Sequence, residues 1–273
     1  MTNRPRKLLV VDIDGTLLNR DGAISDEDTG ALTRACRSGV HVSLSTGRVV
    51  VACLPILERL ALDGYHMFFD GALVFNPQKN QEVYVEQIPA QLVKQIADIA
   101  RLQEVNLDLY SITHFFTERE TWATEIRRRF FNLKPTVVNF DDVWQEERII
   151  KATIVVRSDE EKARAQDIYQ HFKDQLSFSW TRTPAYPEID FINVRAIGVS
   201  KGKALEALAS FLGLSLTDVV AIGDGTNDVS LLSTAGLAIA MGNAHDELKA
   251  VADHVTLDVD HNGVAAAVDR FLL

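Results

Sequence analysis

Two carboxylates separated by one residue are the first candidates for chemistry in this sequence. Asp12 and Asp14 follow the apolar run 8–11, in the segment VVDIDGT. Alternate side chains of an extended strand point to the same side, and open α/β sheets bind ligands beyond the carboxyl ends of their strands. One carboxylate could hold a hard cation such as Mg²⁺ while the other exchanges protons. A surface turn that merely ends the strand is the alternative.

A second acidic group follows another apolar run near the C-terminus, in the segment VVAIGDGTND. Asp224 is separated from the run 219–222 by one glycine, and Asp228 stands four residues later, where a helix is expected to begin. The glycines let the backbone turn sharply and approach a ligand. A plain turn and an ordinary first-turn aspartate would give the same letters. A functional role for this group is favoured because both acidic segments follow strands of the same predicted sheet.

Two further segments could bind an anion. The segment STGR, residues 45–48, follows the expected strand 41–45 and could hold a phosphate through hydroxyl and backbone N–H groups at a helix start. A simple helix cap is the alternative, and for this segment taken alone it is the favoured one. Lys201 begins another helix, where its charge opposes the helix dipole and indicates a nearby anion. A solvated lysine is the alternative there.

The elements that must position these residues alternate between strand and helix at both ends of the chain. Ser25 and Asp28 form a helix-capping pattern, and Gly39 is placed where that helix should end. This alternation predicts a doubly wound α/β fold with a parallel sheet. The expected strands are 7–13, 41–45, 218–222 and 236–240, and the expected helices are 26–38, 49–62, 200–212, 229–234 and 265–273.

The middle of the chain has a different pattern. Its strands carry Thr, Tyr and Phe in period-two alternation, which favours an antiparallel sheet with one solvent-exposed face. We therefore predict a core formed by residues 1–84 and 188–273, with an α+β domain inserted at 85–187. Within the middle segment we expect a hairpin over 72–87, helices at 91–102, 118–131 and 159–173, and strands near 105–116, 149–156 and 176–182.

Composition narrows the function classes. The chain has 273 residues, 28 Lys and Arg against 38 Asp and Glu, and a net charge of −10, which argues against nucleic acid or anionic lipid as partners. Its two cysteines, Cys36 and Cys53, form no metal-binding pattern. No apolar stretch reaches the ~18 residues that a membrane span needs. We expect a cytoplasmic protein without nucleic-acid or membrane partners, as a monomer or weak homodimer.

The chain contains, in this order, DIDGT, STGR, the lone Lys201 and GDGTND, with a large insert between the second and third. Together these segments resemble the haloacid dehalogenase superfamily. The similarity is to its Cof-like, type IIB phosphatases, and it extends through AGLAIAMGNA at residues 235–244. It implies a Rossmann-like core with an inserted cap domain. It also implies Mg²⁺-dependent hydrolysis of small phosphorylated metabolites, such as sugar phosphates, through a phospho-aspartyl intermediate.

The resemblance also implies a role for individual residues. Asp12 would attack phosphorus, Asp14 would protonate the leaving oxygen and later activate water, and Thr46 and Lys201 would bind phosphoryl oxygens. The residues implied to contact phosphate or substrate are Gly47, Arg48 and Asn227. Those implied to hold Mg²⁺ are Asp12, Asp14 through its backbone carbonyl, and Asp224, with Asp228 either as a further ligand or next to the ligands.

One residue departs from the family pattern, and two other activities remain open. The family usually has Asn-Gly-Ala after the third strand, whereas this chain has Asp70 before Gly71 and Ala72.

A phosphomutase of the same superfamily is one alternative activity, and a non-enzymatic receiver phosphorylated on Asp12 is another. A dinucleotide fold is excluded because the first loop lacks GxGxxG, and a P-loop because Ile197 and Ala204 occupy its required positions.

The inserted domain is expected to act as a mobile lid that selects the substrate. Linkers near 80–88 and 183–190 would allow hinge motion that excludes water during the first transfer. A rigid domain that only stabilises the core or forms a dimer contact is the alternative. The charged residues considered for substrate contact are Arg119, Arg127, Arg128, Arg129 and Lys151, and the three consecutive arginines are expected to lie mostly in solvent because they cannot share one helix face.

Overall fold

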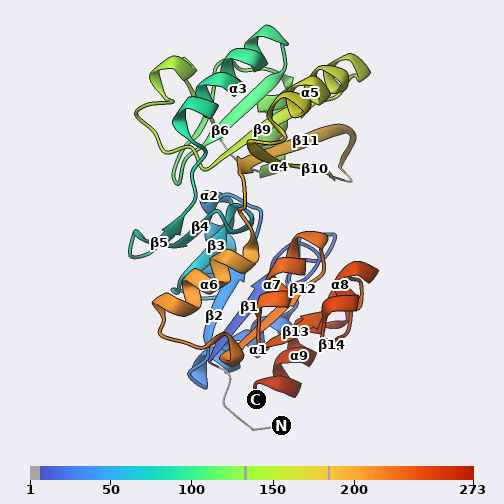
Figure 1. The fold of residues 1–273 in the computed structure, drawn as a ribbon. Coiled ribbons are helices and arrows are strands. Elements are labelled where there is room, and N and C mark those ends of the chain that lie inside the picture. The colour runs from blue at the N-terminus through green and yellow to red at the C-terminus, as the bar shows by residue number, and fades with distance from the viewer. Residues whose placement is uncertain (1–6, 132–133, 184) are drawn as a thin grey trace. The chain divides into compact units, whose positions relative to one another are not determined.

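The computed structural model describes residues 7–131, 134–183 and 185–273. The chain divides into two compact units, each with its own sheet (Figure 1). The first unit consists of the residues up to Arg48 together with Cys53–Tyr84 and Ser200–Leu273, and the second consists of Val49–Ala52 and Val85–Val199.

The first unit is built on a sheet that has eight strands among the described residues. Neighbouring strands from β14 through β3 run parallel, and β4 is antiparallel to β3. All five residues of β1 are buried, which requires cover on both faces of the sheet. In spatial order the strands are β14 (His254–Val255), β13 (Leu237–Ala240), β12 (Val219–Gly223), β1 (Leu8–Asp12), β2 (His41–Ser45), β3 (His66–Phe68), β4 (Leu73–Asn76) and β5 (Gln81–Val85).

Two pairs of helices pack over this sheet. Helix α1 (Asp26–Arg37) contacts α9 (Gly263–Phe271), and α6 (Lys201–Phe211) contacts α7 (Val229–Thr234). The prediction of a doubly wound α/β fold is therefore confirmed. The remaining helices of the unit are α2 (Val50–Arg59), whose first residues belong to the second unit, and α8 (Asp246–Val251).

The local signals that predicted α1 act as expected. The Ser25 hydroxyl accepts a hydrogen bond from the Asp28 N–H at 3.0 Å, which satisfies one of the unpaired donors at a helix start. Gly39, just beyond the helix, has a φ of +88°, a conformation that a residue without Cβ adopts at low cost.

The second unit contains a six-stranded sheet within the described residues. Its strand pairs are antiparallel except β7 with β8. In spatial order the strands are β10 (Leu176–Thr183), β11 (Tyr186–Ala196), β9 (Lys151–Val156), β6 (Asn106–Tyr110), β7 (Phe115–Thr117) and β8 (Thr136–Val137), and the helices are α3 (Ala90–Leu102), α4 (Trp122–Phe131) and α5 (Asp159–Phe172).

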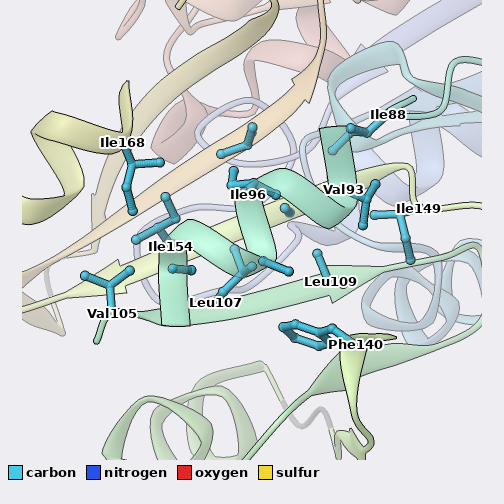
Figure 2. Close-up of a cluster of buried hydrophobic side chains, with 14 of the residues drawn as sticks. Ile88, Val93, Ile96, Val105, Leu107, Leu109, Phe140, Ile149, Ile154 and Ile168 are labelled. Carbon is cyan, nitrogen blue, oxygen red and sulfur yellow. The ribbon is translucent and has the colours of Figure 1, made fainter. Parts of the chain in front are cut away.

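An apolar core joins α3 and α5 to this sheet. Figure 2 shows Ile96 of α3 above Leu107 and Leu109 of β6, with Ile154 of β9 and Ile168 of α5 beside them. Each of these side chains is nearly inaccessible to water, and full burial of an aliphatic side chain contributes about 1.5–3 kcal/mol. The second unit therefore has a hydrophobic core of its own.

Two boundaries in the second unit differ from the sequence prediction. The insert was expected to end at residue 187, but the unit continues to Val199. The reason is β11, which lies between β9 and β10 in the sheet and so belongs to it. The single strand expected near 105–116 is instead two antiparallel strands, β6 and β7, joined by a turn.

The three consecutive arginines of α4 do not all lie in solvent. Arg127 is buried, its Nε donates to Asp108 Oδ2 at 3.1 Å, and its guanidinium lies 4.6 Å from the ring centre of Phe191. Arg128 and Arg129 are on the exposed side of the helix and pair with Glu125. The expectation of solvation is thus wrong for Arg127, because an acidic side chain on the neighbouring sheet compensates its burial.

Within the described residues, every helix is too short or too polar to cross a bilayer.

Candidate active site

The polar segments that follow β1, β2 and β12 lie at one edge of the first sheet. Asp12, the last residue of β1, is paired in register with Ser45, the last residue of β2. On its other side, Val11 is paired with Ile222 of β12, and Figure 1 shows β1 and β12 side by side. Parallel strands end on the same side, so Asp12, Thr46 and Asp224 emerge next to one another.

A buried lysine connects two of the acidic segments. Lys201 Nζ donates to Asp12 Oδ1 at 2.5 Å and to Asp228 Oδ1 at 2.6 Å. Burial by itself lowers the pKa of a lysine, but these two carboxylates more than compensate, so the pKa of Lys201 is raised and the amine stays charged. The first residue of α6 thus brings a fixed positive charge to the end of β1.

The carboxylates around this lysine repel one another. Burial and the neighbouring Asp228 raise the pKa of Asp12 well above its ordinary value, although Lys201 lowers it. Burial, again with a contribution from Asp228, raises the pKa of Asp224 to about 6, while a hydrogen bond from Thr16 Oγ1, at 2.9 Å, lowers it. Three acids beside one lysine leave a surplus of negative charge that a cation would neutralise.

Asp228 uses both of its oxygens within the protein. Oδ1 accepts from Lys201, and Oδ2 accepts from the backbone N–H groups of Asp224 and Gly225 at 3.1 and 3.0 Å. A Cβ at Gly223 would lie 2.6 Å from this carboxylate, so the chain needs a glycine at the end of β12. Asp228 therefore fixes the shape of the loop that carries Asp224.

An acidic group suited to a metal ion is present at this edge. One oxygen each from Asp12, Asp224 and Asp228 lie within 4.8 Å of one another. An all-oxygen, carboxylate-rich donor set is typical of Mg²⁺ or Ca²⁺ rather than of softer metals. The residues therefore fit a hard divalent cation. The carboxylate of Asp14 is not part of this group.

Asp14 instead forms a two-point ion pair with Arg48. Arg48 Nε and Nη2 donate to the two oxygens of Asp14 at 2.9 and 2.6 Å. The Asp14 side chain is 56% exposed, whereas Asp12 is buried. Because the two acids differ in solvation and in partner, they can perform different steps of a reaction. The sequence predicts that Arg48 contacts phosphate, whereas in the structure its guanidinium pairs with Asp14.

Thr46 and Gly47 form the loop after β2. Thr46 is buried, its N–H donates to the Met67 carbonyl at 2.9 Å, and its hydroxyl accepts from the Arg48 N–H at 3.1 Å. A Cβ at Gly47 would lie 2.8 Å from Asp70 Oδ1. A glycine is therefore required here by close approach of the Asp70 carboxylate.

The turn after β3 brings Asp70 to the same loop. Phe69 and Asp70 both have positive φ values, 54° and 56°, and the Asp70 N–H donates to the Thr46 carbonyl at 2.8 Å. Asn227 Nδ2 donates to Asp70 Oδ1 at 2.9 Å. Gly47 and Asn227, which the sequence predicts to contact phosphate or substrate, thus both lie next to the carboxylate of Asp70.

Two polar residues of the site were not singled out by the sequence analysis. Asn243 Nδ2 donates to the Gly15 carbonyl at 2.8 Å, and its Oδ1 accepts from the Val259 N–H at 2.9 Å. Thr16 binds Asp224, as described above. Both residues lie inside segments used for the family resemblance, DIDGT and AGLAIAMGNA, which is the signal that could have identified them.

Comparisons with known proteins agree with this arrangement. The profile of the family described as haloacid dehalogenase-like hydrolases matches residues 9–268. The chain belongs to this family. Among its relatives, phosphatase YwpJ of Bacillus subtilis is 28% identical over 97% of this chain and 100% of its own length. A second protein of that organism, 5-amino-6-(5-phospho-D-ribitylamino)uracil phosphatase YcsE, is 27% identical over 98% of this chain and 96% of its own length.

A solved structure extends the likeness to the fold. The haloacid dehalogenase subclass IIB sugar phosphatase BT4131 superposes with a TM-score of 0.77 at 26% identity, over 97% of this chain and 98% of the other. The family and these relatives make the chain a phosphatase of the haloacid dehalogenase type.

Proposed function

We propose that this phosphatase hydrolyses small phosphorylated metabolites, sugar phosphates among them, with Mg²⁺ and through a phospho-aspartyl intermediate on Asp12. The observation that carries the proposal is the buried contact of Lys201 with Asp12 and Asp228, beside Asp224. Such a cluster provides a carboxylate nucleophile, a fixed cation and a set of metal ligands in one place. Phosphoryl transfer depends mostly on positioning and charge neutralisation, and this cluster supplies both.

In the proposed first step, an Asp12 oxygen attacks phosphorus and the bond from phosphorus to the leaving oxygen breaks. Asp14 donates a proton to that oxygen, so the alcohol leaves neutral. In the second step, Asp14 takes a proton from water, whose oxygen attacks the phosphorus of the acyl phosphate. Phosphate leaves, and the Asp12 carboxylate is restored. The exposure of Asp14 suits a group that must exchange protons with solvent.

The non-bridging phosphoryl oxygens need donors, and four groups are proposed for them. Lys201 carries a full charge, and the Thr46 hydroxyl, the Gly47 N–H and the Asn227 amide add hydrogen bonds. Arg48 is proposed to orient Asp14 through their ion pair. Protonation of Asp14 weakens that pair, which frees the guanidinium for the substrate.

The metal ligands are proposed as Asp12, Asp224 and the backbone carbonyl of Asp14, with Asp228 holding the loop. When bound there, Mg²⁺ would supply positive charge that lets an anionic carboxylate approach an anionic phosphate. The hydrogen bonds from Thr16 and from the backbone N–H groups keep Asp224 and Asp228 in place for this purpose.

Removal of metal tests the proposed function directly. We expect steady phosphate release from p-nitrophenyl phosphate and from a panel of sugar phosphates to stop in EDTA and to return with excess Mg²⁺. Full turnover in metal-free buffer would contradict the proposal. Isomerisation of a sugar phosphate without phosphate release would favour a phosphomutase, and stable labelling of the protein without turnover would favour a receiver.

Asp14→Asn should slow poor leaving groups more than good ones. A sugar alkoxide needs a proton as it departs, whereas p-nitrophenolate does not, so we expect a loss of about 10²–10⁴-fold in kcat with sugar phosphates and a smaller loss with the nitrophenyl ester. The ratio of the two kcat values, measured side by side, is the readout. Equal losses on both substrates would remove Asp14 from the role of general acid.

We propose the second unit as the cap domain that selects the substrate. One face of its sheet carries the apolar core, with Ala152, Ile154 and Val194. Residues of alternate register, Lys151 and Arg195, lie on the opposite face and are more than nine-tenths buried. The same face also carries the small apolar cluster that Val155 and Phe191 form with Ala123 of α4. The two cations beside this cluster are suited to binding hydroxyl or anionic groups of the organic part of a substrate.

A further inference from the structure

Asp70 places a carboxylate among the groups proposed to bind phosphate. Its Oδ1 accepts from Asn227 Nδ2 at 2.9 Å. A Cβ at Gly47 would lie 2.8 and 3.0 Å from its two oxygens, which shows how closely the carboxylate approaches that residue. Its charge also acts on Lys201. Asp70 therefore touches or influences three of the four proposed phosphate-binding groups.

The backbone holds Asp70 firmly in this place. Its left-handed conformation, with φ 56° and ψ 34°, is one that Asp and Asn adopt more readily than other residues with a Cβ. Its N–H is bound to the Thr46 carbonyl. The following Gly71 has a φ of +92°, and a Cβ there would lie 2.3 Å from the Ser200 carbonyl oxygen. The carboxylate is thus fixed between the loop after β2 and the start of α6.

A carboxylate at this position has two opposite effects on a bound phosphate. It accepts one hydrogen of the Asn227 amide, which leaves the second hydrogen of that NH₂ group for a phosphoryl oxygen. The ionised carboxylate accepts hydrogen bonds and donates none, and its negative charge repels a phosphate dianion at short range. The hydrogen bond prepares the site for phosphate, whereas the charge opposes retention of phosphate.

We propose that Asp70 is a positioning residue that orients Asn227 and at the same time weakens the binding of inorganic phosphate, so that the product leaves the site. The inference rests on the proposed phosphatase function. Product phosphate has lost the organic part of the substrate, so the charge of Asp70 acts on a ligand with fewer remaining contacts. The same repulsion acts on a bound substrate, but there the contacts of the organic part offset it.

Two variants separate the charge from the hydrogen bond. Asp70→Asn removes the charge but keeps an oxygen that can accept from Asn227, and Asn tolerates the left-handed backbone. Asp70→Gly removes both charge and acceptor, and glycine adopts positive φ without strain. Asp63→Asn is the matched control, because Asp63 is exposed and precedes β3, whereas Asp70 follows it.

The measurement is phosphate affinity of the Mg²⁺-loaded protein, by calorimetric titration and as product inhibition at one pH. We expect Asp70→Asn to bind phosphate about 5- to 20-fold more tightly than the wild type, and Asp63→Asn to be unchanged. Asp70→Gly should bind phosphate more weakly than Asp70→Asn. In an Asn227→Ala background the two Asp70 variants should bind phosphate equally, because the positioning contact is gone.

The outcomes distinguish this inference from the proposed function. If the wild type hydrolyses phosphomonoesters and Asp70→Asn binds phosphate no more tightly than the wild type, the role of Asp70 is overturned and the phosphatase proposal stands. If phosphate binds more tightly to Asp70→Asn but no phosphomonoester is hydrolysed, the proposed function fails instead. Tighter binding in Asp63→Asn as well would reduce the effect to net charge and would also overturn the inference.

Discussion

Asp12→Asn is expected to lower kcat for phosphomonoester hydrolysis by about 10⁴-fold or more, because an amide cannot form the acyl phosphate. The amide oxygen can still accept from Lys201, so the hydrogen bond seen at 2.5 Å is retained. Burial and Asp228 already raise the pKa of Asp12, so loss of its charge relieves repulsion. We therefore expect the metal-free variant to have a Tm no lower than that of the wild type.

An acid quench during turnover of a substrate with radiolabelled phosphorus gives the direct measurement. The wild type should retain label that hydroxylamine releases, as an acyl phosphate does, and Asp12→Asn should retain none. Asp21→Asn, at an exposed aspartate of the following loop, is the control and should behave as the wild type. Labelled protein from Asp12→Asn would place the covalent intermediate on another residue.

The convergence of the site could be predicted because continuous apolar runs identify strands that are buried on both faces. The residues Val10, Val11 and Val219 to Ile222 have no polar face, and such strands are typical of parallel sheets. Since parallel strands end at the same edge, polar residues directly after them must lie close together. Asp12, Thr46 and Asp224 meet for this reason, and the sequence is sufficient to infer it.

Contacts between side chains of separate loops could not be predicted in the same way. Asp14 is two residues beyond the last residue pair of β1 and β2 and points to solvent, where Arg48 reaches it from the loop after β2. Asp70 meets Asn227 only because Phe69 and Asp70 both adopt positive φ. Neither feature leaves a periodic signal in the sequence, because each depends on a loop conformation that neighbouring segments determine.

The missed strand β11 has a different cause. Its buried stretch, from Ile189 onward, includes Asp190, Asn193 and Arg195, so the polar positions obscure the apolar pattern of a buried strand. In the structure, Thr181 Oγ1 accepts from Asn193 Nδ2 at 3.2 Å, and Asp190 binds Arg182. Polar partners on the neighbouring strand β10 allow these residues to be buried. The insert therefore extends past 187 in a way that hydropathy alone does not reveal.

Lys201→Met is expected to lower kcat by about 10²–10³-fold, because it removes a preorganised charge from the phosphoryl oxygens and from Asp12. It should also lower stability, unlike Asp12→Asn. Lys201 is 1% exposed and lies between Asp12 and Asp228. Removing one partner from a buried ion pair costs about 3–5 kcal/mol, since the remaining charges are left uncompensated.

Two measurements on the same protein separate these effects. Without metal, Lys201→Met should unfold at a lower Tm than Lys203→Met, which changes an exposed lysine of the same helix. Saturating Mg²⁺ should recover part of that difference, because a cation bound to Asp12 and Asp224 binds only the folded state and offsets the acidic repulsion. The kcat loss should persist under those conditions, since a cation held by Asp12 and Asp224 would not replace an ammonium group at the phosphoryl oxygens. Near-normal turnover in Lys201→Met would remove this lysine from the reaction, and an unchanged metal-free Tm would contradict its role as the counter-charge of the two buried acids.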